Sequence, residues 1–327
     1  MTLNRTNDTF NLTYKTDYNT KKAVLTDGEL RMTRILNFGS MNIDYVYQVN
    51  HFVKPGETVS SDSLLTNCGG KGLNQSVALA RAGAKVFHAG KIGAEGVFLK
   101  EYLESCGVDT SYVLLSDEHT GHAIIEVDAA GENAILLYGG ANHSISEAEI
   151  DKVLAHFGEG DILLLQNEIS NIPYIMRRAS EKKMRIFINP APMNAAACEY
   201  PLELAECIFL NEIEASQLAN MPSIESSIEV LEERYPMCML VFTLGEHGVV
   251  CRHGGRNYQH GIYSVKVADT TAAGDTFTGF FTVSVAQDGD IEKALKIASK
   301  ASAITVTREG ASKSIPTRDE VEHFRFS

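Results

Sequence analysis

The stretch KVADTTAAGDTFTGFF, residues 266–281, places small residues before Asp275 and an apolar segment after it. Small side chains let an anion approach the backbone, and the amides at a helix start lie at the positive end of its dipole. We therefore expect an anion hole at Ala272, Ala273 and Gly274. Asp275 would act as a general base on an attacking alcohol while the amides stabilise charge on phosphoryl oxygens. A capped helix start, where Asp is common, is the alternative.

A second polar constellation is NCGGKGLNQSVALARAG, in which glycines surround Lys71 and a helix carrying Asn74 follows. A Walker A loop requires Ser or Thr directly after the lysine, whereas Gly72 stands there. Glycine backbone at Gly70 together with an amine and an amide suits recognition of hydroxyl groups on a polyol. A flexible turn before a core helix is the alternative.

A third candidate is GSMNID at residues 39–44, which ends an apolar strand. Asn42 and Asp44 lie two residues apart, so their side chains point to the same face of a strand. One amide and one carboxylate on that face would bind adjacent hydroxyl groups. A simple Asx turn is the alternative.

The elements that must position these residues alternate from residue 33 onward between apolar strands and amphipathic helices. Strands are expected at RILNFGS, KVFHAGKIG, DILLLQNE, MRIFINP, CIFLNE and MLVFTLG, and helices at LNQSVALARAG and VFLKEYLESCG. This alternation predicts a parallel sheet. The segment HTGHAIIEVDAAGENAILLYGG breaks the rhythm, because two strands joined across residues 129–132 form a hairpin. With DYVYQVNHFVKPGETVSS it predicts a small separate sheet, a lid whose exposed edge a second subunit covers.

The composition excludes several classes of protein. A chain of 327 residues with 44% hydrophobic and 22% charged residues is globular rather than disordered or fibrous. Its net charge of -13 argues against nucleic acid and anionic membranes as partners, but not against ATP, which backbone amides and a bridging cation can hold. The six cysteines include no C-x-x-C pair, so neither zinc nor a disulfide framework is indicated. The first residues are polar and no apolar run approaches membrane-spanning length, which predicts a cytoplasmic protein.

Seven segments in order carry a resemblance to a known family. GGKGLNQS and DTTAAGDTFTG resemble the two signature segments of the PfkB carbohydrate kinases. GSMNID, NPAP, NEIE, TLGEHG and TREGASKS bring the resemblance closest to the ribokinase group of that family, over about residues 33 to 320. It implies a ribokinase-like three-layer α/β fold, with a mostly parallel central sheet flanked by helices and a small β-sheet lid.

The domain organisation follows from these observations. Residues 1–30 are rich in Asn, Thr and Lys without a sustained period and are interpreted as a flexible N-terminal extension. Residues 31–327 are expected to form the kinase domain, with a lid at about 44–64 and 118–139. The family also implies a homodimer formed through the lid.

The resemblance implies an ATP-dependent kinase for the hydroxymethyl group of a small sugar, first of all D-ribose to ribose 5-phosphate. A kinase for another sugar or a nucleoside, and a non-catalytic sugar sensor, are the alternatives. A nucleoside pocket should show aromatic stacking residues, and none is evident. A sensor would tolerate loss of Asp275, Lys71 or Asn74, and all three are present.

The same resemblance assigns roles to residues. The sugar-binding set is Asn42, Asp44, Gly70, Lys71, Asn74, Ala123, Ile135, Glu168 and Asp275. The nucleotide-binding set is Asn211, Thr243, Leu244, Gly245, Glu246, His247, Gly248, Gly274 and Ser299. Glu214, with Asn211, would organise Mg²⁺ through water. A potassium site is implied at Asp269, Thr271, Thr305, Arg308, Gly310 and Ser314, where it would fix the anion-binding turn.

Some residues depart from the family pattern. Phe280 stands where a small residue is usual, so packing behind the catalytic helix must differ locally. Asn167, Tyr138, His122 and Glu126 are bulkier or more polar than is usual and bear on the identity of the substrate. His122 and Glu126 share one face of a strand, where a solvated lid face explains them better than a ligand pair.

Overall fold

The structure, a computed structural model, describes residues 33–326, and the N-terminal extension predicted at 1–30 lies outside them. The predicted fold class is confirmed. A nine-stranded sheet runs through the described part of the chain in the order β13-β12-β11-β10-β9-β8-β1-β4-β5. Its strands are β1 (Arg34–Phe38), β4 (Lys85–Ile92), β5 (Asp109–Leu115), β8 (Ile162–Gln166), β9 (Arg185–Asn189), β10 (Cys207–Asn211), β11 (Met239–Thr243), β12 (Val249–His253) and β13 (Arg256–His260).

The strands from β11 to β5 are parallel to their neighbours, whereas β12 and β13 pair antiparallel at one edge. The sequence explains this arrangement, because every residue of β8, ILLLQ, is buried. A continuous apolar run is typical of a strand covered on both faces by helices.

Helices cover both faces of this sheet, and each layer has its own apolar core. One layer consists of α1 (Lys71–Arg81), α2 (Val97–Ser105), α7 (Ala273–Asp288), α8 (Ile291–Thr305) and α9 (Arg318–His323). The other consists of α3 (Glu147–Leu154), α4 (Ile172–Glu181), α5 (Glu212–Ala219) and α6 (Ile224–Arg234). Short 3-10 helices are η1 (Ala94–Gly96), η2 (Gly140–His143), η3 (Ala197–Glu199), η4 (Leu202–Leu204), η5 (Gly245–His247) and η6 (Ser312–Ser314).

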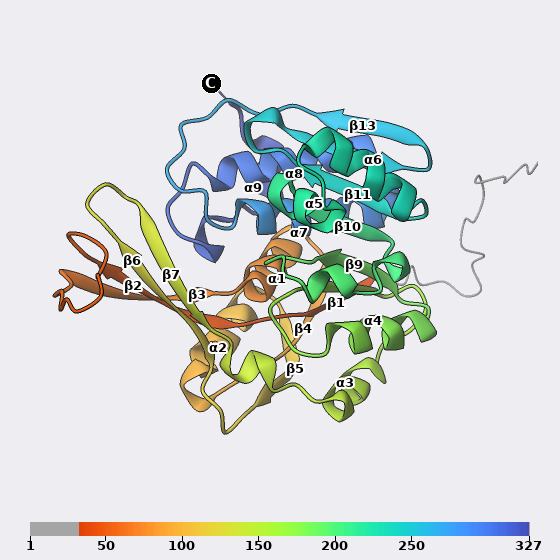
Figure 1. Ribbon diagram of the computed structural model, residues 1–327. Coiled ribbons are helices and arrows are strands. Elements are labelled where there is room, and N and C mark those ends of the chain that lie inside the picture. Colours follow the sequence, from red (N-terminus) through yellow and green to blue (C-terminus); the bar gives the residue numbers. More distant parts are fainter. Residues whose placement is uncertain (1–32, 327) are drawn as a thin grey trace, which may run out of the picture. The chain divides into compact units, whose positions relative to one another are not determined.

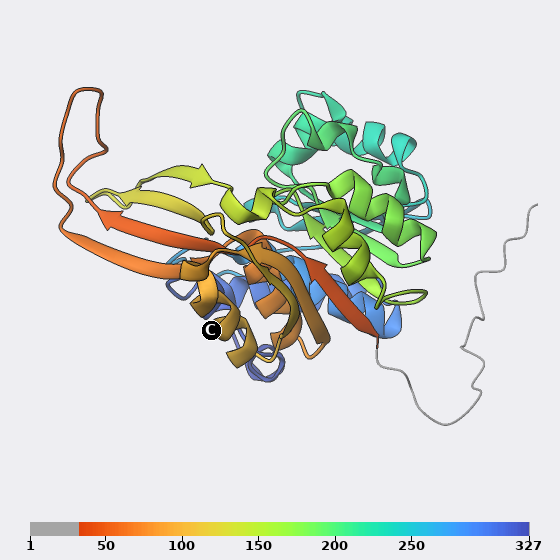
Figure 2. The ribbon, with the colours of Figure 1, turned by 90° about the horizontal axis from the view of Figure 1, so that it is seen from below.

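A separate four-stranded sheet has the order β3-β2-β6-β7 and extends away from the helical layers (Figures 1 and 2). Its strands are β2 (Asn42–Gln48), β3 (Ser63–Gly69), β6 (Gly121–Val127) and β7 (Asn133–Tyr138). β6 and β7 form the hairpin expected from the sequence, and β6 runs parallel to β2. β3 continues past residue 64 to Gly69, so this sheet leads directly into Lys71 and helix α1.

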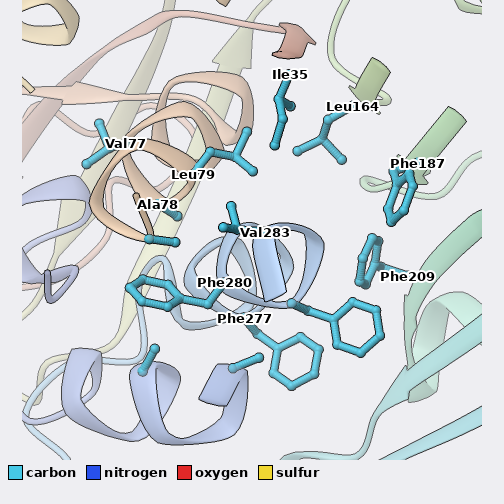
Figure 3. Packing of buried hydrophobic residues seen from close by; sticks show 14 of the residues in the cluster. Ile35, Val77, Ala78, Leu79, Leu164, Phe187, Phe209, Phe277, Phe280 and Val283 are labelled. Carbon is cyan, nitrogen blue, oxygen red and sulfur yellow. The ribbon is translucent and has the colours of Figure 1, made fainter. Parts of the chain in front are cut away.

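Helices α1 and α7 pack at very short distance, and this contact positions the site. A Cβ atom added at Gly279 would lie 2.4 Å from the Cβ of Ala78, so only glycine permits the contact. Figure 3 shows Ala78 and Leu79 on one helix beside Phe280 and Val283 of the other. The buried Phe280 belongs to the core of this layer, so the departure from the family pattern is accommodated by apolar packing.

Within residues 33–326, none of the helices combines the length and the apolar character that crossing a membrane requires.

Candidate active site

A cavity of about 260 Å³ lies where the carboxyl ends of β9, β10 and β11 meet the N-terminus of α7. In open α/β sheets this edge is the usual place for ligands, because the strand ends and helix N-termini converge there. The cavity is lined by Lys71, Asn189, Phe209, Leu210, Asn211, Glu214, Thr243, Thr270, Ala272, Ala273, Gly274, Asp275 and Thr278. It therefore joins the predicted anion hole to residues predicted for the sugar, the nucleotide and Mg²⁺.

The turn before α7 has the backbone shape of an anion site. Ala272 adopts a left-handed conformation with φ 59°, which turns the chain into the helix. The amide of Ala273 donates to the carbonyl of Thr270 at 3.3 Å. Within residues 33–326 the amides of Ala272 and Gly274 make no hydrogen bond, so they are the donors available to an anion.

Asp275 lies in the first turn of α7 and is 6% exposed. Each of its carboxylate oxygens accepts an amide hydrogen bond from α1: Asn74 Nδ2 lies 3.0 Å from Oδ2, and Gln75 Nε2 lies 2.9 Å from Oδ1. Two donors from consecutive residues hold the carboxylate in one orientation. Gln75 was not among the residues expected from the sequence.

Several carboxylates surround Lys71, which begins helix α1 directly after the small sheet. The Glu168 carboxylate accepts from the Lys71 amide at 2.9 Å and from the Ser40 hydroxyl. Burial raises the pKa of Glu168, although the positive charge of Lys71 opposes this effect. Burial would lower the pKa of Lys71, but the negative charges of Asp275, Glu168 and Glu214 outweigh it and the pKa is raised. The lysine is therefore held as a cation among carboxylates.

Asp44 lies on β2, opposite Ala123 of β6. Burial, with a contribution from the charge of Glu168, raises its pKa to about 7. A Cβ atom added at Gly69 would lie 2.0 Å from Asp44 Oδ2, so the carboxylate occupies the space that a side chain would need there. No hydrogen bond to the Asp44 carboxylate is present among residues 33–326, which leaves it as an acceptor for a ligand.

The other predicted sugar-binding residues fall on the same side of the small sheet. Asn42 is buried, and its Oδ1 accepts from Asn142 Nδ2 at 2.8 Å. Ala123 is buried, whereas Ile135 on β7 is 60% exposed. Strand register puts Ile135 two residues from Leu137, the partner of Ala123, and therefore on the face of the sheet that carries Ala123.

Asn211 and Glu214 form a capping box at the start of α5. Glu214 N donates to Asn211 Oδ1 at 2.8 Å, and Asn211 N donates to Glu214 Oε2 at 2.9 Å. This arrangement is an ordinary helix start with acidic residues in its first turn, and it also presents Glu214 to the cavity. Burial raises the pKa of Glu214. Among residues 33–326 no group of three or more His, Cys, Asp or Glu side chains is placed to hold a metal ion.

The predicted nucleotide loop follows β11. Thr243 lines the cavity, and the chain then turns through η5, where Leu244 N donates to Gly248 O at 2.8 Å. The rest of the loop, at 244–248, and the half-buried Ser299 on α8 do not line this cavity.

Of the predicted potassium residues, hydrogen bonds bring Asp269, Thr271 and Gly310 together beside the anion-binding turn. Asp269 accepts from the Thr271 amide at 2.8 Å and from the Gly310 amide at 3.0 Å, which joins two distant loops. Burial would raise its pKa, but these hydrogen bonds outweigh that effect and the pKa is lowered. Thr305 and Ser314 are buried, and the Arg308 side chain pairs with Glu320 at 2.7 Å, so only its carbonyl would be a ligand. The oxygen donors of this set suit a monovalent cation.

Sequence reasoning also missed the lining residues Asn189, Phe209, Leu210, Thr270 and Thr278. Asn189 ends β9 in the NPAP segment, and the rule that polar residues at carboxyl ends of parallel strands face the ligand edge could have found it.

Fold and site together define a class of protein. A doubly covered parallel sheet, a helix N-terminus with free amides and a fixed carboxylate beside them are features of an enzyme that transfers a phosphoryl group to an alcohol. The model of the pfkB family of carbohydrate kinases matches residues 32–318, and the chain belongs to this family.

Relatives and solved structures agree with this assignment. Ribokinase of Haemophilus influenzae is 36% identical over 296 residues, which cover 88% of this chain and 96% of that protein. The crystal structure of ribokinase from Cryptococcus neoformans in complex with ADP matches with a TM-score of 0.80 and 33% identity, covering 89% of this chain and 99% of that one. The structure of Arabidopsis thaliana ribokinase complexed with ribose and ATP matches with a TM-score of 0.79 and 28% identity, covering 90% and 99%.

Proposed function

We propose that this enzyme transfers the γ-phosphoryl group of ATP to the hydroxymethyl group of D-ribose and forms ribose 5-phosphate and ADP. The observation that carries the proposal is the buried Asp275 carboxylate, held by two amides beside the free N–H groups of Ala272 and Gly274. The similarity to ribokinases, two of them with ADP or with ribose and ATP bound, supports the choice of substrates.

In the proposed reaction, Asp275 accepts the proton of the attacking sugar hydroxyl while the oxygen of that hydroxyl forms a bond to the γ-phosphorus. The bond from the γ-phosphorus to the β-γ bridging oxygen breaks, and ADP leaves with that electron pair. The amides at 272 and 274 and the ammonium of Lys71, which is held among carboxylates, stabilise negative charge on the transferred group. When bound with ATP, Mg²⁺ would neutralise charge on the phosphates, with Glu214 and Asn211 nearest to it among the predicted residues.

The sugar would lie between the cavity and the small sheet. Asn42, Asp44 and Glu168 offer oxygen acceptors, and the buried Asn74 contributes an Oδ1 atom with no hydrogen-bond partner among residues 33–326. A buried acceptor without a donor is costly, so a sugar hydroxyl is a natural partner for it.

The four-stranded sheet would act as the lid. Closure over the sugar would exclude water and limit hydrolysis of ATP. The sheet exposes large apolar side chains at Leu64, Leu65, Ile135, Leu136, Leu137 and Tyr138. Exposed apolar residues on a sheet favour pairing with a second copy, and we propose a homodimer through this sheet. Light scattering on the purified protein tests this, because a monomer at working concentrations would contradict it.

A monovalent cation bound by Asp269 and the neighbouring carbonyls would fix the anion-binding turn without touching substrate. Turnover measured in potassium, sodium and tetramethylammonium buffers tests this proposal. Equal rates in all three would refute it.

The test of the proposed function is ADP release with ATP and Mg²⁺ against ribose, deoxyribose, fructose and nucleosides, with Asp275→Asn in parallel. We expect ribose-dependent turnover that the variant loses. Turnover only with another acceptor would keep the mechanism and replace the substrate. Ligand binding without phosphoryl transfer would instead favour a sugar sensor.

A further inference from the structure

Asp275, the proposed base, is hydrogen-bonded to a chain of buried amide side chains that runs from α1 to the neighbouring strands β8 and β1. Asn37 on β1, Gln166 on β8 and Gln75 on α1 are each at most 1% exposed. Gln166 Nε2 lies 2.9 Å from Asn37 Oδ1 and 2.6 Å from Gln75 Oε1, and Gln75 Nε2 lies 2.9 Å from Asp275 Oδ1. Buried amides normally pair both polar ends, and within residues 33–326 Gln166 Oε1 is the one end of these three amides that has no hydrogen-bond partner.

A backbone carbonyl, which can only accept, fixes the direction of the first amide in this chain, and the directions of the other two follow from it. Asn37 Nδ2 lies 2.7 Å from the backbone carbonyl of Gly72, so the NH₂ end of Asn37 must face that carbonyl. Asn37 Oδ1 then faces Gln166, which must present its NH₂ group. Because that NH₂ group also faces Gln75, the oxygen of Gln75 points to Gln166 and its NH₂ group points to Asp275.

A second anchor sets the same direction independently. Asn189 Nδ2 donates to the carbonyl of Phe209 at 3.1 Å, which turns Asn189 Oδ1 toward Gln75 Nε2 at 3.4 Å. The NH₂ group of Gln75 is therefore surrounded by two acceptors, and a flipped Gln75 would place its oxygen against both. Two backbone carbonyls, those of Gly72 in α1 and Phe209 in β10, thus determine the orientation of one side chain.

From this geometry we infer that Gln75 is a positioning residue for the base, and that Gln166 and Asn37 act through it. Gln75 presents a donor to one oxygen of Asp275 in every turnover, which leaves Asn74, at the other oxygen, free to contact the sugar with its Oδ1 atom. The inference rests on the proposed function, because it assigns Asp275 the role of base. Gln75 is fully buried and both ends of its amide are occupied by protein groups, so it should affect the rate of the chemical step and not sugar binding.

The test compares Gln75→Met and Gln166→Met with Thr282→Val. Both Met variants keep side-chain length and remove the amide, whereas Thr282 is a buried residue of α7 whose hydroxyl has no hydrogen-bond partner among residues 33–326. We expect Gln75→Met to lower kcat by about tenfold to hundredfold, the usual effect of a lost hydrogen bond to a charged group, with KM for the sugar within about twofold. Gln166→Met should lower kcat in the same way without touching Asp275, and Thr282→Val should leave both constants unchanged.

Wild-type turnover and the inactive Asp275→Asn variant establish the function separately from this inference. With those in place, a Gln75→Met enzyme whose kcat matches Thr282→Val overturns the positioning role and leaves the function intact. A rise in KM for the sugar as large as the fall in kcat in Gln75→Met would overturn the positioning role too, because it would indicate a general distortion of the site. If Gln75→Met does not fold, as judged by circular dichroism, Gln166→Met decides between the same two outcomes.

Discussion

The two aspartates of the site are held in opposite ways. Asp275, at the contact of α1 and α7, accepts a hydrogen bond at each oxygen from a buried amide. Asp44, at the root of the small sheet, has no such donor among residues 33–326 and lies near the charge of Glu168, so burial raises its pKa to about 7. Both oxygens of Asp275 thus have hydrogen-bond donors within the protein, whereas the Asp44 carboxylate has none among residues 33–326.

This difference separates two tasks. A base must keep one orientation throughout the reaction, and fixed donors on two helices provide that. A residue that recognises hydroxyl groups must have unused acceptors, and the protein bears the cost of burying a carboxylate that only a ligand satisfies. In the proposed function, the donors for Asp44 are the sugar hydroxyls.

The largest effect should come from exchanging the two carboxylates for isosteric amides one at a time. Asp275→Asn removes the base and sets an NH₂ group against Asn74 or Gln75, so kcat should fall by about 10²–10⁴-fold. Asp44→Asn should act mainly on KM for the sugar. Steady-state kinetics with the sugar varied check both. If Asp44→Asn lowers kcat as much as Asp275→Asn does, the two aspartates do not have separate roles in catalysis and sugar binding.

Asp44 should also make the enzyme less stable as pH rises. Its pKa of about 7 in the folded protein exceeds the ordinary value of 3.8, so the folded state binds a proton that the unfolded state lacks between those pH values. Stability from this group is therefore full below about pH 4 and is lost as pH rises through about 7. Asp44→Asn should raise the free energy of unfolding at pH 8 by on the order of 2–4 kcal/mol and leave it unchanged at pH 4.

Urea unfolding at the two pH values measures this effect. Asp62→Asn is the matched control, because Asp62 is an exposed carboxylate just before β3 and its loss should change stability at neither pH. A gain in Asp44→Asn that is equal at pH 4 and pH 8 would exclude the ionised carboxylate as the cause.

The sequence predicted the parts of this site that depend on local pattern. Strand and helix periodicity placed the layers. The small residues before Asp275 predicted the turn, but of the three amides expected there the one at Ala273 is hydrogen-bonded to Thr270. Gln75 was missed because it lies in a helical run, LNQSVALA, where one more polar residue carries no signal. Its partner Asp275 lies 200 residues away in the chain, and the packing of α1 on α7, which is very close at Gly279, brings the two together.

The extent of β3 was also not evident from the sequence. Its leucines at 64 and 65 are 49% and 60% exposed, so the usual burial of one face does not mark the strand. Its partner is β2, and Asn42 pairs with Gly69 at its end. Pairing across more than twenty residues decides where such a strand stops, and a local pattern does not contain that information.

The smallest effect should come from moving the helices that carry the base and its donors. Gly279→Ala would place a Cβ atom 2.4 Å from that of Ala78, which forces α1 and α7 apart. Overpacking of this kind costs about 1–3 kcal/mol of stability. Because Ala78 lies four residues from Asn74, and Gly279 four residues from Asp275, the shift should lengthen the hydrogen bonds to the base and lower kcat more than it raises KM for the sugar.

Ala78→Gly added to Gly279→Ala removes the shortest contact and leaves backbone contacts of 2.9 Å to Ala78 and Leu79, so the double variant should recover part of both melting temperature and kcat. Recovery of stability without recovery of kcat would mean that the separation of the helices does not control the base. Full recovery of both would instead show that one short helix contact sets the geometry of Asp275, while Asp44, on a different element, keeps its affinity for the sugar throughout the series.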